Sequence, residues 1–266
     1  MLDLDFAQLS DHGRVRGNNE DYLGVSQPET PEEAESHGWL FALADGVGGA
    51  DRGEVASRTA VEHLVAAFAR AKAHEALPSL LARLVREANQ HVYDLAKNTK
   101  PGGSSMATTL VACALRHDRA TIAHAGDSRC YLIRHGEARL LTRDHTVVAD
   151  QARLGIISAS DAAQSAVSHV LSRSLGPDLF LNVDTSEHQI LPNDVLMLCC
   201  DGLHHSIAAE EIAAMAGKTA DLEGAARRLI ALANERDGSD NISVQLIRIR
   251  SVERIGMYRG RIYKLR

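Results

Sequence analysis

Four acidic segments, far apart in the sequence, could together bind divalent cations. They are Asn19-Glu20-Asp21, Asp45-Gly46-Val47-Gly48-Gly49, Asp201-Gly202-Leu203 and Asp240-Asn241. Two of them directly follow apolar runs, residues 40–44 and 195–200, which predict buried strands. A carboxylate at a strand end, followed by glycine, is expected where the chain emerges into a cleft. Clustered carboxylates cannot all stay ionised without a cation, and hard oxygen ligands favour Mg²⁺ or Mn²⁺ over Zn²⁺. The pattern therefore predicts a metal-dependent hydrolase.

The elements that must position these segments favour an α+β fold. Short apolar or alternating runs predict strands at residues 4–9, 39–44, 108–115, 120–125, 129–134, 138–141, 179–189, 194–200 and 242–249. Apolar residues at helical spacing predict helices across 61–71, 77–95, 208–216 and 221–235. The two long helices are consecutive and simple βαβ alternation is missing, so α+β fits better than a doubly wound sheet.

The connecting segments carry further expectations. Residues 26–38 predict a solvated loop, and residues 106–141 predict an antiparallel meander. Residues 144–168 are rich in alanine and predict partly helical structure with a break at Gly155. The residues after 250 are expected to form a surface extension or an added edge strand.

The composition is that of an ordinary globular protein: 266 residues, 45% hydrophobic and 24% charged. A net charge of −6 and an aromatic content of 4% argue against a nucleic-acid partner. The N-terminus does not resemble a signal peptide, and no apolar run approaches the roughly 18 residues of a membrane span. Cys113, Cys130, Cys199 and Cys200 lie in apolar segments and are expected to be buried, reduced thiols. We therefore expect a cytoplasmic protein without membrane contact.

The chain resembles the metal-dependent protein serine/threonine phosphatases, the PPM or type 2C family, in their bacterial single-domain form. A single Asp-Gly pair is uninformative because turns use it routinely, but an ordered set is specific. The matching segments run in the family's order from about residue 8 to residue 249. Besides the four acidic segments, they include Ser10-Asp11-His12-Gly13-Arg14-Val15-Arg16, Gly53-Glu54-Val55-Ala56-Ser57, Ala125-Gly126-Asp127-Ser128-Arg129, Leu141-Thr142-Arg143-Asp144-His145-Thr146 and Ser172-Arg173-Ser174-Leu175-Gly176.

The resemblance implies a central antiparallel β-sandwich flanked by helices on both faces, with a metal cleft at one end. It also implies a catalytic domain over residues 1–250, with a flap-like segment at about 145–170. A basic tail, residues 251–266, would follow the matched domain.

The resemblance also assigns metal ligands. Asp45 would bridge two Mn²⁺ or Mg²⁺ ions, and the Gly46 carbonyl would add a ligand to one of them. Asp201 and Asp240 would hold the second ion, and Asp127 would help Asp201 hold a third, weaker one. Two such cations clamp an in-line displacement at phosphorus and lower the pKa of a shared water. The alternatives are that Asp45 and Asp201 cap turns and that Asp127 belongs to a hairpin turn.

Three further residues are expected to support catalysis. Glu20 and Asp21 would act in the outer shell by holding metal-bound waters, although Asn-Glu-Asp taken alone is more often an exposed turn. Arg16 corresponds to the family's phosphate-binding arginine, whose planar guanidinium matches phosphate oxygens. Arg14 is the competing candidate in the same loop, and the spacing favours Arg16.

The chain departs from the family's pattern at Val47, where some members have a histidine proposed as general acid, and at Ala107, where glycine is usual. Other residues are expected to carry no chemistry. Thr108 and Thr109 would be strand hydroxyls, His145 would pack or hydrogen-bond locally, and the pair His204-His205 would be exposed.

The implied activity is hydrolysis of phosphoserine and phosphothreonine by direct attack of a hydroxide that bridges two Mn²⁺ or Mg²⁺ ions. The expected partners are phosphorylated proteins and a cognate serine/threonine kinase, and the chain is expected to be monomeric. The alternatives are a regulatory phosphoprotein-binding module with weak activity and a hydrolase of small phosphate esters. The opening segment and Tyr258-Arg259-Gly260-Arg261 also resemble phosphatases that accompany bacterial type VI secretion systems.

Overall fold

Two antiparallel five-stranded sheets pack face to face in the computed structural model. The structure describes residues 2–47, 50, 52–99, 104–163, 165, 167, 169–217, 219–253, 255–258 and 261–264. The first sheet has the strand order β2 (Asp21–Ser26), β3 (Trp39–Asp45), β4 (Leu110–Arg116), β5 (Arg119–Ala125), β8 (Asp184–Gln189). The second has the order β1 (Asp3–Asp11), β10 (Ile242–Ser251), β9 (Val195–Cys199), β6 (Arg129–Arg134), β7 (Glu137–Leu140).

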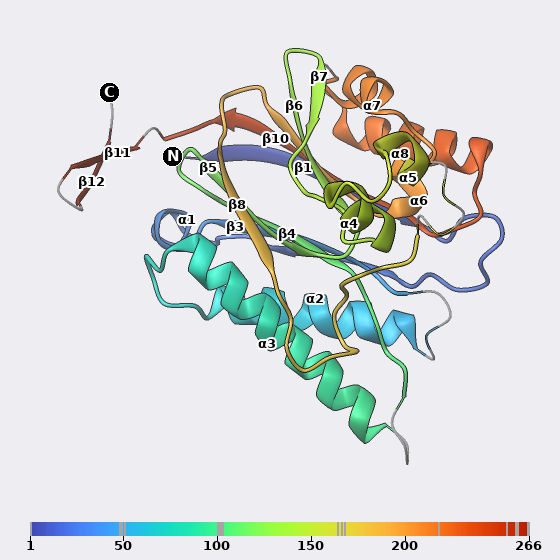
Figure 1. Ribbon diagram of the computed structural model, residues 1–266. Helices are drawn as coiled ribbons and strands as arrows, with labels where there is room; N and C mark the ends of the chain where they lie inside the picture. Colours follow the sequence, from blue (N-terminus) through green and yellow to red (C-terminus); the bar gives the residue numbers. More distant parts are fainter. Residues whose placement is uncertain are drawn as a thin grey trace.

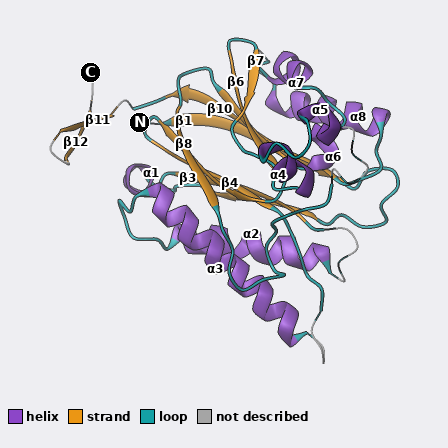
Figure 2. Cartoon of the chain, viewed as in Figure 1, coloured by secondary structure: helices purple, strands orange, loops and turns teal. Residues whose placement is uncertain are grey.

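Helices cover both outer faces of the sandwich, which confirms the predicted architecture (Figures 1 and 2). The long helices α2 (Gly53–Ala69) and α3 (Leu77–Asn98) lie on the first sheet, and α7 (Ala209–Ala216) and α8 (Leu222–Arg236) lie on the second. The short helices are α1 (Pro31–Ser36), α4 (Val147–Arg153), α5 (Ala159–Ala163) and α6 (Asp201–His204). None of the described helices combines the length and the apolar character that a bilayer crossing requires.

Strands β3 and β9 are apolar along their whole length because both of their faces are covered. In β3, Leu40 and Ala42 pack under α2 and α3, whereas Phe41 and Leu43 fill the core between the sheets. Successive side chains of a strand point to opposite faces, so a continuous apolar run supplies two cores at once. Each fully buried Leu or Phe contributes roughly 1.5–3 kcal/mol. Strand β3 ends at Asp45, and Asp201 begins α6 two residues after the end of β9.

The predicted meander over residues 106–141 is wrong. Strands β4 and β5 form a hairpin in the first sheet, whereas β6 and β7 form a hairpin in the second. The chain crosses between the sheets at Gly126, whose φ is +110°. A Cβ there would lie 2.6 Å from Thr109 Cβ, so glycine is required for this crossing. The crossing sets the next residue, Asp127, at the end of the sandwich.

Three other boundaries differ from the expectations. The predicted loop at 26–38 contains α1, because Thr30 caps it by accepting from the Glu33 N–H and Pro31 occupies its first turn. Strand β8 begins at Asp184 rather than near 179, which leaves Phe180 90% exposed.

Strand β10 continues to Ser251. Beyond it, β11 (Ile255–Tyr258) and β12 (Arg261–Lys264) pair with each other in a separate hairpin that projects from the sandwich (Figure 1). Arg259 and Gly260, of the quoted tail segment, lie outside the described residues.

Candidate functional site

A cleft of about 260 Å³ at one end of the sandwich brings together most of the predicted site residues. Its lining contains Arg16, Asp45, Gly46, Val47, Thr109, Asp127, His169, Leu171, Asp201 and Asp240. The carboxylates come from different strand ends and loops, so the fold brings together residues that are far apart in the sequence. His169 and Leu171, from the end of the flap-like segment, were not predicted. Glu20 and Asp21 are not part of this lining, and Asp21 is buried opposite Asp45 in the strand register.

Strands β2 and β3 fix two carboxylates relative to each other. Asp21 begins β2, Asp45 ends β3, and the two are direct register partners. The backbone of Asp45 is held from both sides: its N–H donates to Thr109 Oγ1 at 3.1 Å, and its carbonyl accepts from Thr108 Oγ1 at 2.8 Å. The two threonines, for which no chemistry was predicted, therefore orient Asp45. Only the strand register could have revealed this role.

Two glycines allow the backbone to approach closely behind the carboxylates. A Cβ on Gly46 would lie 2.5 Å from the carbonyl carbon of Gly53, at the start of α2. A Cβ on Gly202 would lie 2.2 Å from the carbonyl oxygen of Asn241. Any larger residue would push Asp45 or Asp201 away from its neighbours. The Asp-Gly pairs are therefore steric requirements of the cleft as well as turn signals.

Asn241 ties the N-terminal loop to the cleft. Its Nδ2 donates to the carbonyls of His12 and Asn18, at 3.1 and 3.0 Å, and its Oδ1 accepts from the Glu20 N–H at 2.8 Å. The loop before β2 is therefore anchored beside Asp240 although more than 200 positions separate them in the sequence. This anchoring brings Arg16 into the same cleft as the carboxylates.

The electrostatics of the cleft fit a bound cation. Burial, and then the charges of neighbouring carboxylates, raises the pKa of Asp21 and of Asp127 to about 7. Burial and the adjacent Asp21 raise the pKa of Asp45 well above its usual value. Both carboxylate oxygens of Asp21 are buried, and the nearby Ser243 and Cys200 side chains offset the rise in its pKa only in part. A divalent ion would remove this mutual repulsion and supply the missing positive charge.

Arg16, rather than Arg14, reaches the cleft. Arg16 Nη2 donates to Asp240 Oδ2 at 2.8 Å, with both side chains partly exposed. Arg14 instead packs its side chain on Gly238 and donates its N–H to the Gly238 carbonyl. The guanidinium of Arg16 has five N–H donors, so it can contact Asp240 and still offer donors toward the cleft. Of the two candidates, only Arg16 lines the cleft.

The prediction that His204 and His205 are both exposed is wrong for His204. The His204 ring is buried and its Nε2 donates to the carbonyl of Asp127 at 3.0 Å. His205 keeps 47% of its side chain exposed. His204 follows Asp201 by one turn of α6, so it connects the loop of Asp127 to the helix that carries Asp201.

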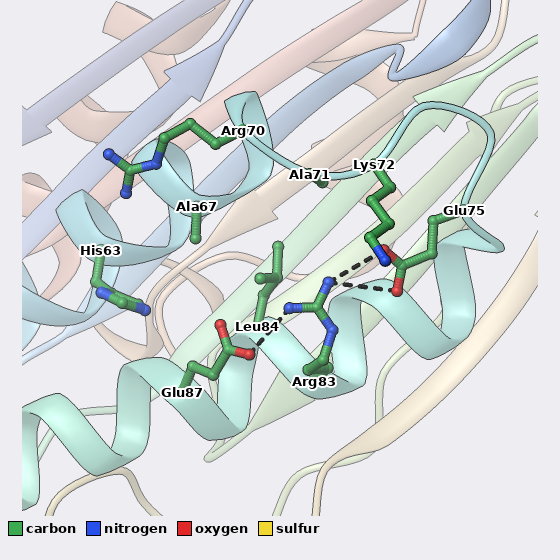
Figure 3. Close-up of a pocket in the computed structure, with 9 residues that line it drawn as sticks. All are labelled: His63, Ala67, Arg70, Ala71, Lys72, Glu75, Arg83, Leu84 and Glu87. Atoms are coloured by element: carbon green, nitrogen blue, oxygen red, sulfur yellow. Dashed lines mark hydrogen bonds and ion pairs between the residues drawn. The ribbon is translucent and has the colours of Figure 1, made fainter.

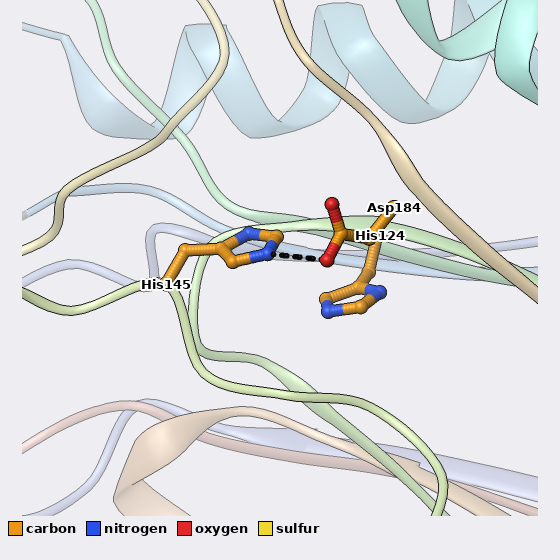
Figure 4. Close-up of side chains that lie close together, drawn as sticks. All are labelled: His124, His145 and Asp184. Atoms are coloured by element: carbon orange, nitrogen blue, oxygen red, sulfur yellow. Dashed lines mark ion pairs between the residues drawn. The ribbon is translucent and has the colours of Figure 1, made fainter. Parts of the chain in front are cut away.

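A second cluster of titratable groups is formed by His124, His145 and Asp184 (Figure 4). His145 Nδ1 accepts from the Gly126 N–H and its Nε2 donates to Asp184 Oδ2, at 3.2 Å each. The two imidazoles stack, with centroids 4.7 Å apart, and desolvation lowers the pKa of His145 to about 4.

The surroundings of this cluster argue against a metal ion there. Asp184 also accepts from Arg173 at 2.8 Å and from Arg143 at 3.0 Å. Two guanidiniums already neutralise the carboxylate, and the ring nitrogens of His145 are engaged. The cluster is a hydrogen-bonded support for the Gly126 turn, which agrees with the local role predicted for His145.

A larger cavity, about 550 Å³, lies between α2 and α3 and contains none of the predicted site residues (Figure 3). Arg83 bonds to Glu75 and Glu87 along its α3 side, so these three charges are paired within one wall. The chemistry expected from the sequence therefore belongs to the smaller carboxylate cleft.

The family follows from these features and from comparison with known proteins. The family model for protein phosphatase 2C matches residues 11–241, which include all the cleft residues. The chain therefore belongs to the protein phosphatase 2C family and is a hydrolase of the serine/threonine protein phosphatase class.

Individual relatives cover nearly the whole chain. The serine/threonine phosphatase stp of Listeria innocua is 34% identical over 255 residues, 95% of this chain and 96% of the relative. Solved structures include the phosphatase PstP of Mycobacterium tuberculosis, with a TM-score of 0.81, 30% identity, and coverage of 94% of this chain and 100% of that one. A structure of the PstP catalytic domain with two manganese ions has a TM-score of 0.79. PppA, a regulatory component of the type VI secretion system of Pseudomonas aeruginosa, has a TM-score of 0.75 and 28% identity, over 92% and 97% of the two chains.

Proposed function

We propose that this enzyme hydrolyses phosphoserine and phosphothreonine in proteins, using two Mn²⁺ or Mg²⁺ ions held by the cleft carboxylates. The observation that carries the proposal is the convergence of Asp45, Asp201 and Asp240 in one cleft, with Asp21 buried opposite Asp45 in the strand register. The two manganese ions in the similar PstP structure support the choice of metal.

Each cleft residue has a proposed role. Asp45 would bridge the two ions, with the Gly46 carbonyl on one and Asp201 and Asp240 on the other. Asp127, with Asp201, would hold a third. When bound, the ions would lower the pKa of a water and offset charge on the phosphoryl oxygens. Glu20 and Asp21 would act from behind the cleft by holding ordered waters.

Arg16 would orient the substrate. Its guanidinium projects into the cleft lining and can bind two phosphate oxygens while keeping one donor on Asp240. The planar guanidinium would hold the phosphoryl group in line for attack by water, without a covalent enzyme intermediate. Val47 cannot donate a proton, so the leaving serine or threonine oxygen would take its proton from water or from another group.

The wider role is a further part of the proposal. The enzyme would act in the cytoplasm and oppose a serine/threonine kinase whose phosphorylated targets it restores. The similarity to PppA supports a place beside a type VI secretion system. The binding-module alternative would be favoured if a ligand position were replaced, whereas Asp45, Asp201 and Asp240 are all present.

Phosphopeptide turnover with and without Mn²⁺ tests the proposal, with p-nitrophenyl phosphate and DNA as competing substrates. Asp45→Asn should reduce turnover on the order of 100-fold or more, because it removes the bridging charge. Asp237→Asn, which changes an exposed carboxylate outside the cleft, is the matched control. Undiminished turnover in Asp45→Asn would contradict the mechanism, and a preference for p-nitrophenyl phosphate would favour the hydrolase of small phosphate esters.

A further inference from the structure

Two histidines meet between the long helices α2 and α3, beside the larger cavity. His63 of α2 lines this cavity, and the ring of His91 of α3 lies against it with the ring centroids 4.0 Å apart. The two rings are tilted by 35° and are therefore not in parallel contact. Neither histidine lines the carboxylate cleft, so the pair is separate from the chemistry proposed above.

His63 has a ring nitrogen that is free to bind a ligand. Its Nε2 is buried, and no hydrogen-bond partner reaches it within the described part of the chain, whereas buried polar atoms are normally paired. Desolvation, and then the neighbouring His91, lowers the pKa of His63, so its ring is neutral at neutral pH and keeps a lone pair for a metal ion. Glu87 raises this pKa more than Arg70 lowers it, so these two side chains together favour a cation beside His63.

Glu87 can complete the set of donors. It lies one helical turn before His91 on α3, so both side chains project from the same face of that helix. Figure 3 shows the carboxylate of Glu87 and the ring of His63 at the same end of the cavity, on facing helices. Oε1 of Glu87 accepts from Arg83 at 2.9 Å, but Arg83 also donates to both carboxylate oxygens of Glu75. Glu87 can therefore turn toward an ion without leaving Arg83 unpaired.

We propose that His63, His91 and Glu87 bind a divalent transition ion, Zn²⁺ or Cu²⁺, that links α2 to α3. Imidazole nitrogens suit these two ions, whereas Mg²⁺ and Mn²⁺ are better matched by oxygen ligands alone. Two imidazoles on one tetrahedral ion have ring centroids roughly 5 Å apart, so the two rings need to separate by only about 1 Å. The cavity of about 550 Å³ has room for the water that completes the coordination shell.

Copper titration of the full-length protein tests the site, with Mg²⁺ in excess to compete for the carboxylate cleft. Electron paramagnetic resonance measures the hyperfine coupling of Cu²⁺ to imidazole nitrogen, and the unmodified protein should show coupling to two such nitrogens. In His91→Ala, which changes an exposed side chain, the Cu²⁺ concentration at half-saturation should rise on the order of 10- to 100-fold. His63→Ala should give the same loss.

His188→Ala is the matched control. His188 is also half-buried, and desolvation likewise lowers its pKa, but it lies on β8 and outside the cavity. Its replacement should leave the Cu²⁺ affinity and the nitrogen coupling unchanged. Equal Cu²⁺ affinity in His91→Ala and His188→Ala, or a Cu²⁺ signal without nitrogen coupling in the unmodified protein, would overturn the site.

Two further variants define the donor set and its location. Glu87→Gln should raise the half-saturating Cu²⁺ concentration on the order of tenfold, and an unchanged value would remove Glu87 from the donors. Asp45→Asn should keep the nitrogen coupling, because Asp45 lies in the other cleft. Loss of the coupling in Asp45→Asn would place the copper in the carboxylate cleft and overturn the proposal. Since no measurement uses turnover, failure of this site leaves the proposed function untouched, and the reverse also holds.

Discussion

Asp21 and Asp45 stand directly opposite each other at the ends of β2 and β3, at the back of the cleft. Two carboxylates in this relationship repel each other unless a cation lies between or beside them. The fold holds them together regardless, because β3 is buried on both faces and its end is fixed by Thr108 and Thr109. We therefore expect the stability of the sandwich to be coupled to metal binding.

Metal addition should stabilise the folded protein. Because the ions bind the folded cleft and not the separated segments of the unfolded chain, Mn²⁺ at about 100 times its Kd should add about 2.7 kcal/mol. A thermal melt with and without Mn²⁺ measures the effect, and a chelator should reverse it. Asp45→Asn should lose most of the stabilisation. A melting temperature that does not change when Mn²⁺ is added would contradict a cation site in the cleft.

The metal-free protein should lose stability as the pH rises through the window from about 4 to about 7. The pKa of Asp21 and of Asp127 rises from 3.8 to about 7 on folding, so between these values the folded state binds more protons than the unfolded state. The contribution of the two carboxyl groups to the free energy of unfolding is full below pH 4 and lost above pH 7. Its size is on the order of a few kcal/mol for each group.

Urea unfolding with chelator present, at pH 5 and pH 8, measures this dependence. Asp127→Asn removes one of the two titrating groups and should make the loss between the two pH values smaller. An equal pH dependence in the variant would show that Asp127 ionises normally in the folded protein.

Thr109→Val should destabilise the protein and weaken Mn²⁺ binding. The change leaves the Asp45 N–H and the Ser128 hydroxyl, which lies 2.7 Å from Thr109 Oγ1, without a partner. Unpaired buried groups of this kind cost about 1–3 kcal/mol. Thr121→Val is the matched control, since the hydroxyl of Thr121 on β5 is buried without a partner and its removal should be neutral or stabilising. Equal loss in both variants, measured by urea unfolding, would count against a positioning role for Thr109.

Asp184→Ala should destabilise the protein by about 1–3 kcal/mol, because it leaves His145, Arg173 and Arg143 without their shared acceptor. Glu223→Ala, which breaks an exposed pair with Arg227 on α8, should leave the unfolding midpoint almost unchanged. Asp184→Ala should also weaken Mn²⁺ binding, since His145 supports the Gly126 turn before Asp127. If Asp184→Ala were as stable as Glu223→Ala, the cluster of His124, His145 and Asp184 would not contribute to the stability of the fold.

Local patterns were sufficient for most elements. The apolar runs that end at Asp45 and Asp201 predicted β3 and β9, and helical spacing predicted α2, α3, α7 and α8. The expectation of buried, reduced cysteines is confirmed, since all four are free and buried. The errors fell where local and tertiary information differ: β4–β5 and β6–β7 look like one meander in sequence, but a single turn at Gly126 assigns them to different sheets.

The sequence by itself determined the chemistry available: carboxylates placed after buried strands, an arginine near the N-terminus and glycines where the backbone must pass closely. Only the tertiary structure decided which of these groups meet, because strand register is set by contacts between distant segments rather than by neighbours in the chain. Register places Asp21 opposite Asp45, and strand alternation sends Cys199 and Cys200 to opposite sides of β9. It is likewise tertiary packing that buries His204 and directs its ring to the carbonyl of Asp127.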